Sequence, residues 1–245
     1  AEGRVNMVGP LSVAVPGNLL AWSAALARGG RFSLADVLQP AIRLARRGFT
    51  VSPYLADCAA EAGADMARDA AISALFLPGG SPIAAGATLR NPALAETLEA
   101  IAVGGPEALH GGAIGASAAR DIAARGGILT LADLAAQRMV ERAPIRGLYR
   151  GFEVLAPPPP SAAGVHVAQM LNLLEGFDIA ALGFGNSARL HLVAEALKMA
   201  FADRAAATAD PAFVSVPVER LISKDYAAQR RAELDPTRAR AWVPG

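Results

Sequence analysis

Four consecutive prolines, at positions 157–160, constrain the fold of this chain more than any other feature. Each proline lacks a backbone N–H and has a fixed φ angle, so the run is excluded from a helix interior and from a central strand. It must form a loop between two regular elements. Ser161 follows directly and is a natural N-cap. The apolar residues after it recur at helical spacing and predict a helix over residues 163–175.

The segment before the prolines predicts two short strands. Residues 140–149 and 152–155 are rich in β-branched and aromatic side chains, and Arg150-Gly151 separates them. This pattern is typical of two paired strands. A further short strand is expected at residues 11–15.

Helices are predicted over most of the remaining chain. N-cap residues such as Ser33 and Asn91 begin the helical patterns, and Gly-Gly pairs end several of them. Pro40 falls inside one pattern and should kink that helix or divide it in two. The predicted helices cover residues 19–28, 34–47, 92–103, 114–124, 163–175, 187–207, 217–222 and 223–234, with shorter ones beginning at residues 53 and 130.

Composition supports a helix-rich globular chain. Hydrophobic residues make up 53% of the sequence and charged residues 18%, which excludes a disordered chain. Much of the apolar share is alanine, which favours closely packed helices. The sequence shows no internal repeat and no linker, so we expect a single domain over residues 1–245. Its last residues, 235–245, contain two prolines and are expected to form a disordered tail.

Charge and motif spacing argue against several classes of function. The net charge is +1, and Asp36 interrupts the densest group of arginines, so no nucleic-acid partner is expected. No uncharged apolar run approaches the ~20 residues of a membrane helix. The histidines, His110, His166 and His191, lack metal-ligand spacing, so no metal or other cofactor is expected. Cys58 is the single cysteine, and inert packing is the expected role.

Several strings match one enzyme family in order along the chain. Residues 158–164 read P-P-P-S-A-A-G, where γ-glutamyltransferases have P-P-P-S-S-G-G. Residues 169–178 are similar to the family's Q-x-L-N-I-L-E-x-F-D, and residues 191–204 to its H-L-x-A-E-A-x-K-x-A-F-A-D-R. Residues 12–17 and 39–49 continue the agreement. The chain thus resembles the large-subunit portion of the γ-glutamyltransferase (glutathione hydrolase) family.

The resemblance implies both a fold and a chemistry. The implied fold is the α+β, four-layer αββα sandwich of N-terminal-nucleophile hydrolases, with this chain as the mainly helical large-subunit part. In that family a precursor cuts itself before a threonine, which becomes the nucleophile of a separate small subunit, with its own α-amine as base. The family's T-T-H motif does not occur in this sequence. The resemblance therefore implies that the catalytic residues lie on the partner and that Gly245 falls shortly before the processing site.

Ser161 is the candidate substrate-binding residue that the resemblance indicates in this chain. A serine at a helix N-terminus can donate to a substrate carboxylate, although a role as N-cap alone remains the alternative. The family's next serine and first glycine are Ala162 and Ala163 here, and its L-G-D-P is T-A-D-P at residues 208–211. No match to the family's carboxylate-binding R-E-x-A-P string is found.

Four charged residues share the predicted long helix at spacings of three and four, a pattern that indicates a surface ladder of ion pairs or a subunit interface. They are Glu195, Lys198, Asp203 and Arg204.

Three functions remain open at this stage. The first is a γ-glutamyltransferase-like amidohydrolase acting on a small amide such as glutathione. The second is a related amidase, of the cephalosporin acylase or oxamate amidohydrolase type, and the third is a non-catalytic scaffold. The apolar helical layer predicts an interface with the small subunit well above ~2,000 Å². Localisation stays open: periplasmic or secreted as in most bacterial members, or cytoplasmic.

Overall fold

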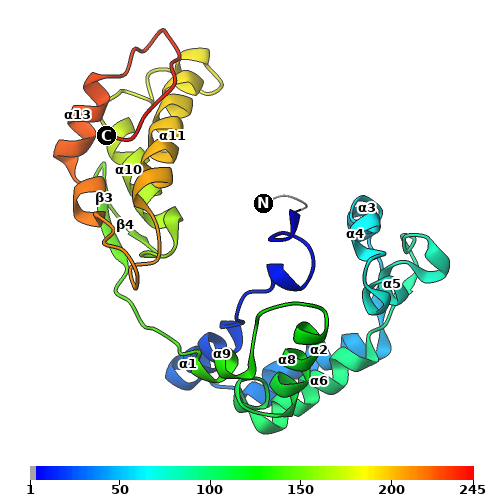
Figure 1. Ribbon diagram of the computed structural model, residues 1–245. Helices are drawn as coiled ribbons and strands as arrows, with labels where there is room; N and C mark the ends of the chain where they lie inside the picture. Colours follow the sequence, from blue (N-terminus) through cyan, green and yellow to red (C-terminus); the bar gives the residue numbers. More distant parts are fainter. Residues whose placement is uncertain (1–3) are drawn as a thin grey trace. The chain divides into compact units, whose positions relative to one another are not determined.

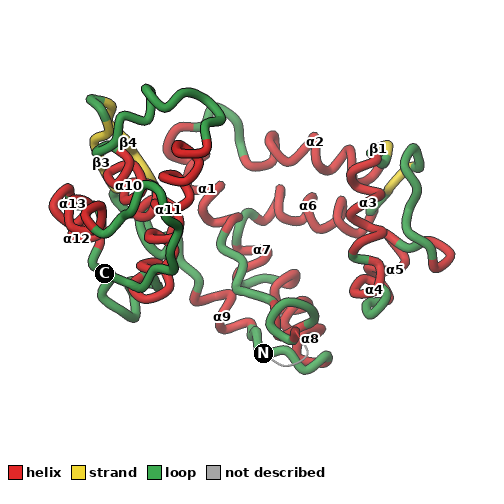
Figure 2. Tube along the Cα trace, turned by 90° about the horizontal axis from the view of Figure 1, so that it is seen from above, coloured by secondary structure: helices red, strands yellow, loops and turns green. Residues whose placement is uncertain are grey.

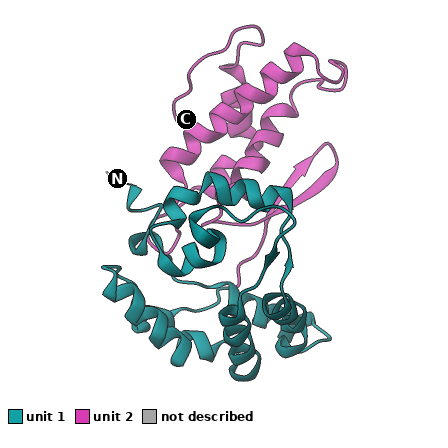
Figure 3. Ribbon diagram, turned by 90° about the vertical axis from the view of Figure 1, so that its right-hand side faces the viewer, with its two compact units in different colours: residues 1–140 teal, residues 141–245 magenta. Residues whose placement is uncertain are grey.

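The computed structural model describes residues 4–245, which divide into two compact units. Of the described residues, those up to 140 belong to unit 1 and residues 141–245 to unit 2 (Figure 3). Helices predominate in both, and the described strands form two separate antiparallel pairs (Figure 2). This agrees with the predicted mainly helical α+β chain. The prediction that residues 1–245 form a single domain stays a prediction.

Unit 1 is built around a pair of packed helices, α2 (Leu34–Arg47) and α6 (Pro92–Gly104), with Ile42, Ala45 and Ala95 buried between them (Figure 1). A second cluster, centred on Val51 and Ala59, lies beside a short strand pair. The other elements of the unit are the helices α1 (Asn18–Gly29), α3 (Pro53–Glu61), α4 (Gly63–Met66), α5 (Ala70–Phe76), α7 (Glu107–His110), α8 (Ala113–Ala124) and α9 (Leu131–Ala136), the 3-10 turns Pro10–Ser12 and Pro78–Gly80, and the strands β1 (Phe49–Thr50) and β2 (Thr88–Leu89).

Local side-chain caps begin several of these helices, as predicted. Ser33 accepts a hydrogen bond from the Asp36 amide while Asp36 reaches back to Ser33, which completes a capping box. Thr130 and Asp133 form the same arrangement at α9. Asn91 accepts from the Leu94 amide at 3.0 Å. These bonds satisfy backbone donors that a helix start leaves open.

Unit 2 consists of a β-hairpin and four helices. The strands β3 (Ile145–Tyr149) and β4 (Phe152–Ala156) are antiparallel, with Tyr149 opposite Phe152. Arg150 and Gly151 both have positive φ angles, 48° and 85°, which a tight two-residue hairpin turn requires. Helix α10 (Ala162–Leu174) packs against the hairpin, α11 (Ser187–Ala207) and α13 (Lys224–Ala232), while α12 (Val218–Leu221) precedes α13 (Figure 1).

The structure differs from the sequence predictions in several details, and helices α4, α5 and α7 were not predicted. Residues 11–15 do not form a strand: Pro10–Ser12 is a 3-10 turn and no strand pairs with the segment in the described chain. The hairpin starts at Ile145 because Pro144 cannot donate to a ladder. Helix α2 runs through Pro40 without being divided. The pair of β1 and β2 was not predicted, because each strand has only two residues.

Candidate functional site

Ser161 stands at the N-cap position of α10, directly after the proline loop. Its side chain accepts no capping hydrogen bond from the helix. Its amide donates to the Pro158 carbonyl at 3.2 Å. At three other helix starts, Ser33, Ser52 and Ser223 do accept such bonds. The first turn of α10 therefore has amides that this serine does not satisfy, and the predicted substrate-binding role of Ser161 remains a prediction.

Gly164 explains why α10 can begin so close to the proline loop. A Cβ atom at this glycine would lie 2.0 Å from the Pro157 carbonyl oxygen and 3.1 Å from the Ala156 Cβ. No side chain fits without moving the backbone. Ala163, which replaces the other family glycine, is exposed, and Ala162 is half-buried. The two positions where this chain has alanine in place of the family's serine and glycine therefore have room for a Cβ atom.

A chain of buried polar groups runs from α10 to α13 beneath this helix start. His166 Nδ1 lies 2.9 Å from Gln169 Oε1, and the Gln169 amide donates to Asp203 Oδ2. Tyr226 Oη also donates to Asp203 Oδ2, at 2.8 Å. Because Gln169 uses its NH₂ on Asp203, its oxygen accepts from His166 Nδ1–H, and Nε2 is then the acceptor for Thr208 Oγ1 at 2.8 Å. The carboxylate of Asp203 is thus solvated by protein donors rather than by water.

Tyr226 remains a neutral donor in this chain of bonds. Burial raises the pKa of its phenol to about 12, and the hydrogen bond to Asp203 adds to the shift.

Glu195 is the second buried carboxylate of α11. Lys198 Nζ lies 2.5 Å from its Oε1, and the indole Nε1 of Trp242 donates to Oε2 at 2.7 Å. Burial raises the pKa of Glu195, but the hydrogen bonds from Lys198 and Trp242 outweigh this effect, so the net pKa lies below the ordinary value.

The predicted surface ladder of ion pairs is wrong for Glu195 and Asp203, because each residue is only 1% exposed. Only the Glu195–Lys198 pair forms as expected, while the Arg204 guanidinium stacks on Phe201.

A third polar cluster ties the hairpin to the ends of two helices. Lys224 Nζ donates to the Leu148 carbonyl at 2.6 Å, to Asn172 Oδ1 at 2.6 Å and to Glu175 Oε2 at 2.5 Å. Glu175 Oε1 accepts from the Arg150 amide at 2.7 Å. The backbone hydrogen bond from Arg150 and the contact with Lys224 lower the pKa of Glu175. This cluster fixes the hairpin turn against the C-terminal end of α10.

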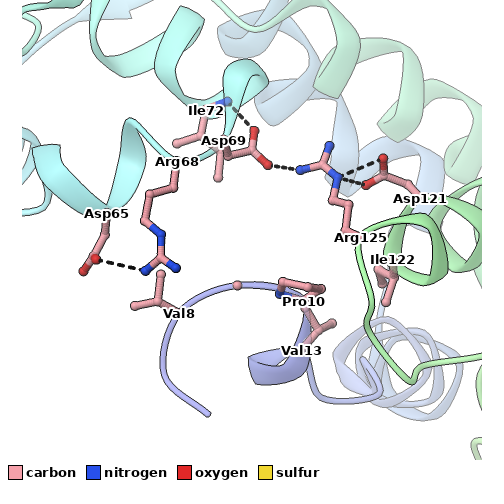
Figure 4. Close-up of a pocket in the computed structure, with 11 residues that line it drawn as sticks. Val8, Pro10, Val13, Asp65, Arg68, Asp69, Ile72, Asp121, Ile122 and Arg125 are labelled. Carbon is pink, nitrogen blue, oxygen red and sulfur yellow. Dashed lines mark hydrogen bonds and ion pairs between the residues drawn. The ribbon is translucent and has the colours of Figure 1, made fainter. Parts of the chain in front are cut away.

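One cavity of unit 1 is lined by apolar residues and by charged groups that pair with one another (Figure 4). Its volume is about 460 Å³, and it lies between the segment around Pro10, the α4–α5 region and the end of α8. Arg125 contacts both Asp69 and Asp121, and Arg68 lies 3.9 Å from Asp65. These pairs leave the cavity with little free charge for a ligand.

The described residues include neither a group placed to bind a metal ion nor a helix suited to span a membrane. Among residues 4–245, no group of three histidine, cysteine or carboxylate side chains is placed to hold a metal ion. No helix in the same range is long and apolar enough to cross a membrane. The Thr208 hydroxyl lies beside the His166 imidazole, a pairing that can activate a nucleophile. Thr208, however, lines neither the cavity of Figure 4 nor the cavity lined by Asn172, Glu175 and Lys224.

Comparison with known proteins finds a matching family and similar sequences for this chain. A family model described as gamma-glutamyltranspeptidase matches residues 1–244. The chain is 56% identical over 242 residues to an "Acylase ACY 1 proenzyme" of Pseudomonas sp. (strain V22), covering 99% of this chain and 43% of the relative. It is 39% identical over 240 residues to the "Glutathione hydrolase proenzyme" of Escherichia coli (strain K12), covering 98% and 41%. The chain thus spans less than half the length of these relatives.

Solved structures show the same fold. The Helicobacter pylori gamma-glutamyltranspeptidase matches with a TM-score of 0.94 at 33% identity, covering 97% of this chain and 68% of that one. The cephalosporin acylase from Bacillus halodurans matches with a TM-score of 0.86 at 32% identity, covering 93% and 43%. The predicted fold, the helical large-subunit part of an N-terminal-nucleophile hydrolase, is confirmed.

Proposed function

The chain belongs to the gamma-glutamyltranspeptidase family, and we propose that its full-length protein is a γ-glutamyltransferase-like amidohydrolase of the glutathione hydrolase type. The observation that carries this proposal is the family match over residues 1–244, which extends through both units. The relatives named above are proenzymes. This chain spans about two fifths of their length, so the activity proposed is that of the full-length protein.

The nucleophile in this proposal is the N-terminal threonine of a small subunit from the same precursor. Its hydroxyl attacks the carbonyl carbon before it, and the peptide nitrogen leaves to give an ester, which one water molecule then hydrolyses. The large subunit keeps the new carboxylate, and the small subunit keeps a free threonine amine. That amine then serves as the base when the hydroxyl attacks the substrate amide and an acyl-enzyme forms. Water or an amino acid takes up the acyl group.

The present chain would contribute support and one substrate contact. Ser161 begins a helix of 13 residues whose first amides and positive dipole end suit a carboxylate. Its hydroxyl is not engaged in capping that helix. It would donate to the carboxylate of the acyl group, so its loss should weaken substrate binding rather than the chemical step.

A related acylase is the second candidate. Identity to the Pseudomonas acylase proenzyme is 56%, against 39% to the Escherichia coli glutathione hydrolase proenzyme. The replacement of the family's second serine by Ala162 removes a donor beside Ser161. A serine hydroxyl can donate to a carboxylate or accept from an ammonium group, so its loss leaves one partner fewer for the α-substituents of glutamate and suits an acyl group with fewer polar substituents.

One set of assays on the full-length protein tests both candidates. Intact mass should reveal two chains, the smaller one beginning with threonine. γ-Glutamyl-p-nitroanilide, glutaryl-p-nitroanilide and oxamate are then compared side by side. Turnover of the γ-glutamyl compound with the highest kcat/KM supports the first function, and a preference for the glutaryl compound supports the acylase. A correctly processed protein that cleaves none of them is a scaffold.

A further inference from the structure

The last residues of the chain follow a defined path across unit 2 because two buried carboxylates hold them. Glu195 and Asp203 lie on α11 about two turns apart, which brings them to one side of the helix. Glu195 accepts from the Trp242 indole at 2.7 Å, and Asp203 Oδ1 accepts from the Gly245 amide at 2.9 Å. A buried carboxylate is destabilising without hydrogen-bond donors. The terminal segment supplies donors to the two carboxylates of α11, and the same bonds hold the segment in place.

Two arginines reinforce this attachment. The guanidinium carbon of Arg230 lies 5.3 Å from the centre of the Trp242 ring, and that of Arg240 lies 4.2 Å away. Arg230, which is 4% exposed, also donates to the Val243 carbonyl at 2.8 Å. The indole additionally packs against the core cluster of Leu173, Leu192 and Met199.

A side chain at position 245 would have to displace two neighbouring side chains. A Cβ atom there would lie 2.5 Å from Tyr226 Oη and 2.7 Å from Arg230 Cδ. The glycine amide can reach Asp203 because nothing projects from its α-carbon toward α13. Residues 242–245 are therefore fixed by an indole at one end and by a fitted glycine at the other.

We propose that Asp203 and Glu195 are positioning residues for processing of the precursor. By holding residues 242–245 they would fix one end of the backbone that leads, in the proposed precursor, to the scissile bond. This restraint would reduce the number of conformations that the segment explores before the threonine attacks. The proposal rests on the proposed function. It also requires the terminal segment to be held in solution, in contrast to the disorder that its composition predicts.

The test is a processing time course of full-length precursor variants. In Asp203→Asn the remaining side-chain oxygen should stay toward its two buried donors, Gln169 and Tyr226. The new NH₂ group then faces the Gly245 amide, which loses its acceptor. Trp242→Leu removes the indole donor to Glu195 while keeping an apolar side chain. The matched control is Tyr226→Phe, which perturbs the same carboxylate but leaves its Oδ1 bond to Gly245 in place. Precursor loss is followed by denaturing gel and intact mass, and thermal midpoints are measured in parallel.

Both Asp203→Asn and Trp242→Leu are expected to slow the first-order loss of precursor by about tenfold, the effect of one lost hydrogen bond. Tyr226→Phe should process within about twofold of the wild type. Once cleaved, each variant should show wild-type kcat/KM, because the attachment acts before maturation. Equal slowing in all three variants, or wild-type rates in the first two, would overturn the proposal. A wild-type precursor that never cleaves contradicts the proposed function instead, and this proposal falls with it.

Discussion

Tyr226 donates a 2.8 Å hydrogen bond to Oδ2 of Asp203, and both side chains are almost completely buried. The bond joins α13 to α11 inside the core of unit 2. It requires the phenol to be protonated and the aspartate to accept, so it couples the stability of this unit to alkaline pH.

We expect the stability of unit 2 to fall at high pH through Tyr226. The pKa of Tyr226 is raised from 10.0 to about 12 in the folded state. A raised pKa contributes stability that is fully present below the unfolded value and is lost as pH rises through the folded value. The affected window is therefore about pH 10 to 12, and the loss should be about 2 to 3 kcal/mol. Urea denaturation at pH 8, 10 and 11.5 measures it. Tyr226→Phe should flatten this part of the profile, and an unchanged alkaline slope in that variant would refute the assignment.

Glu195 should contribute to the loss of folding stability at acid pH. Its folded pKa is lowered below 4.5 because Lys198 and Trp242 outweigh the effect of burial. A lowered pKa contributes stability that is present above the unfolded value and is lost as pH falls through the folded value. Glu195→Gln should be less stable than wild type at pH 7 by about 1 to 3 kcal/mol, and the difference should shrink below pH 4.5.

The matched control for Glu195 is Glu153→Gln. Glu153 pairs with Arg146 on the exposed hairpin at 2.6 Å, where an ion pair contributes ~0 to 1 kcal/mol. If both glutamine variants show the same pH dependence, Glu195 has no special role in acid unfolding.

Replacing Lys224 by methionine should loosen the hairpin. The ammonium group joins the Leu148 carbonyl to Asn172 and Glu175. Methionine keeps an unbranched side chain of similar shape that lacks the ammonium group and its bonds. We expect a loss of about 1 to 2 kcal/mol and faster amide exchange at Arg150, whose N–H bonds to Glu175. Arg146→Met, which breaks an exposed pair on the same hairpin, provides the comparison. Arg150 exchange that is unchanged in Lys224→Met would contradict this role.

Gly164→Ala tests the close approach of α10 to the proline loop. The new Cβ would lie 2.0 Å from a backbone carbonyl, so the loop or the helix must move, and we expect a loss of about 3 kcal/mol. Ala163→Gly, one position earlier at an exposed site, should cost no more than about 1 kcal/mol. The thermal unfolding midpoints of both variants measure this difference. Similar midpoints would show that the proline loop moves to accommodate the new Cβ at little cost in stability.

Sequence reasoning succeeded where structure is set by neighbours in the chain. Ser33, Asn91 and Thr130 begin helices because their side chains reach amides three positions ahead. The hairpin turn at Arg150 and Gly151 is equally local. Strands β1 and β2 escaped prediction because each has two residues and its partner lies far along the chain.

The buried carboxylates show why the rest could not be predicted. The spacing of Glu195 and Asp203 with Lys198 and Arg204 indicates an exposed ladder if only α11 is considered. Several of their donors, however, come from Tyr226, Trp242 and Gly245, which only the fold brings to this helix. The candidate substrate contact at Ser161 came from the family resemblance, since periodicity alone would assign it a cap.

Ser161→Ala separates the two roles of that serine. A capping serine would lose ~1 kcal/mol of stability on substitution, but Ser161 makes no side-chain cap bond. We therefore expect the variant to unfold within about 0.5 kcal/mol of wild type. If the hydroxyl donates to the substrate carboxylate, KM should rise about tenfold with kcat nearly unchanged, because the bond forms equally in the ground and transition states. The control is Ser223→Ala, which removes a true cap from α13 and should lower stability without changing KM. A Ser161 variant with wild-type KM on every substrate that the processed protein accepts would exclude the serine from the binding site.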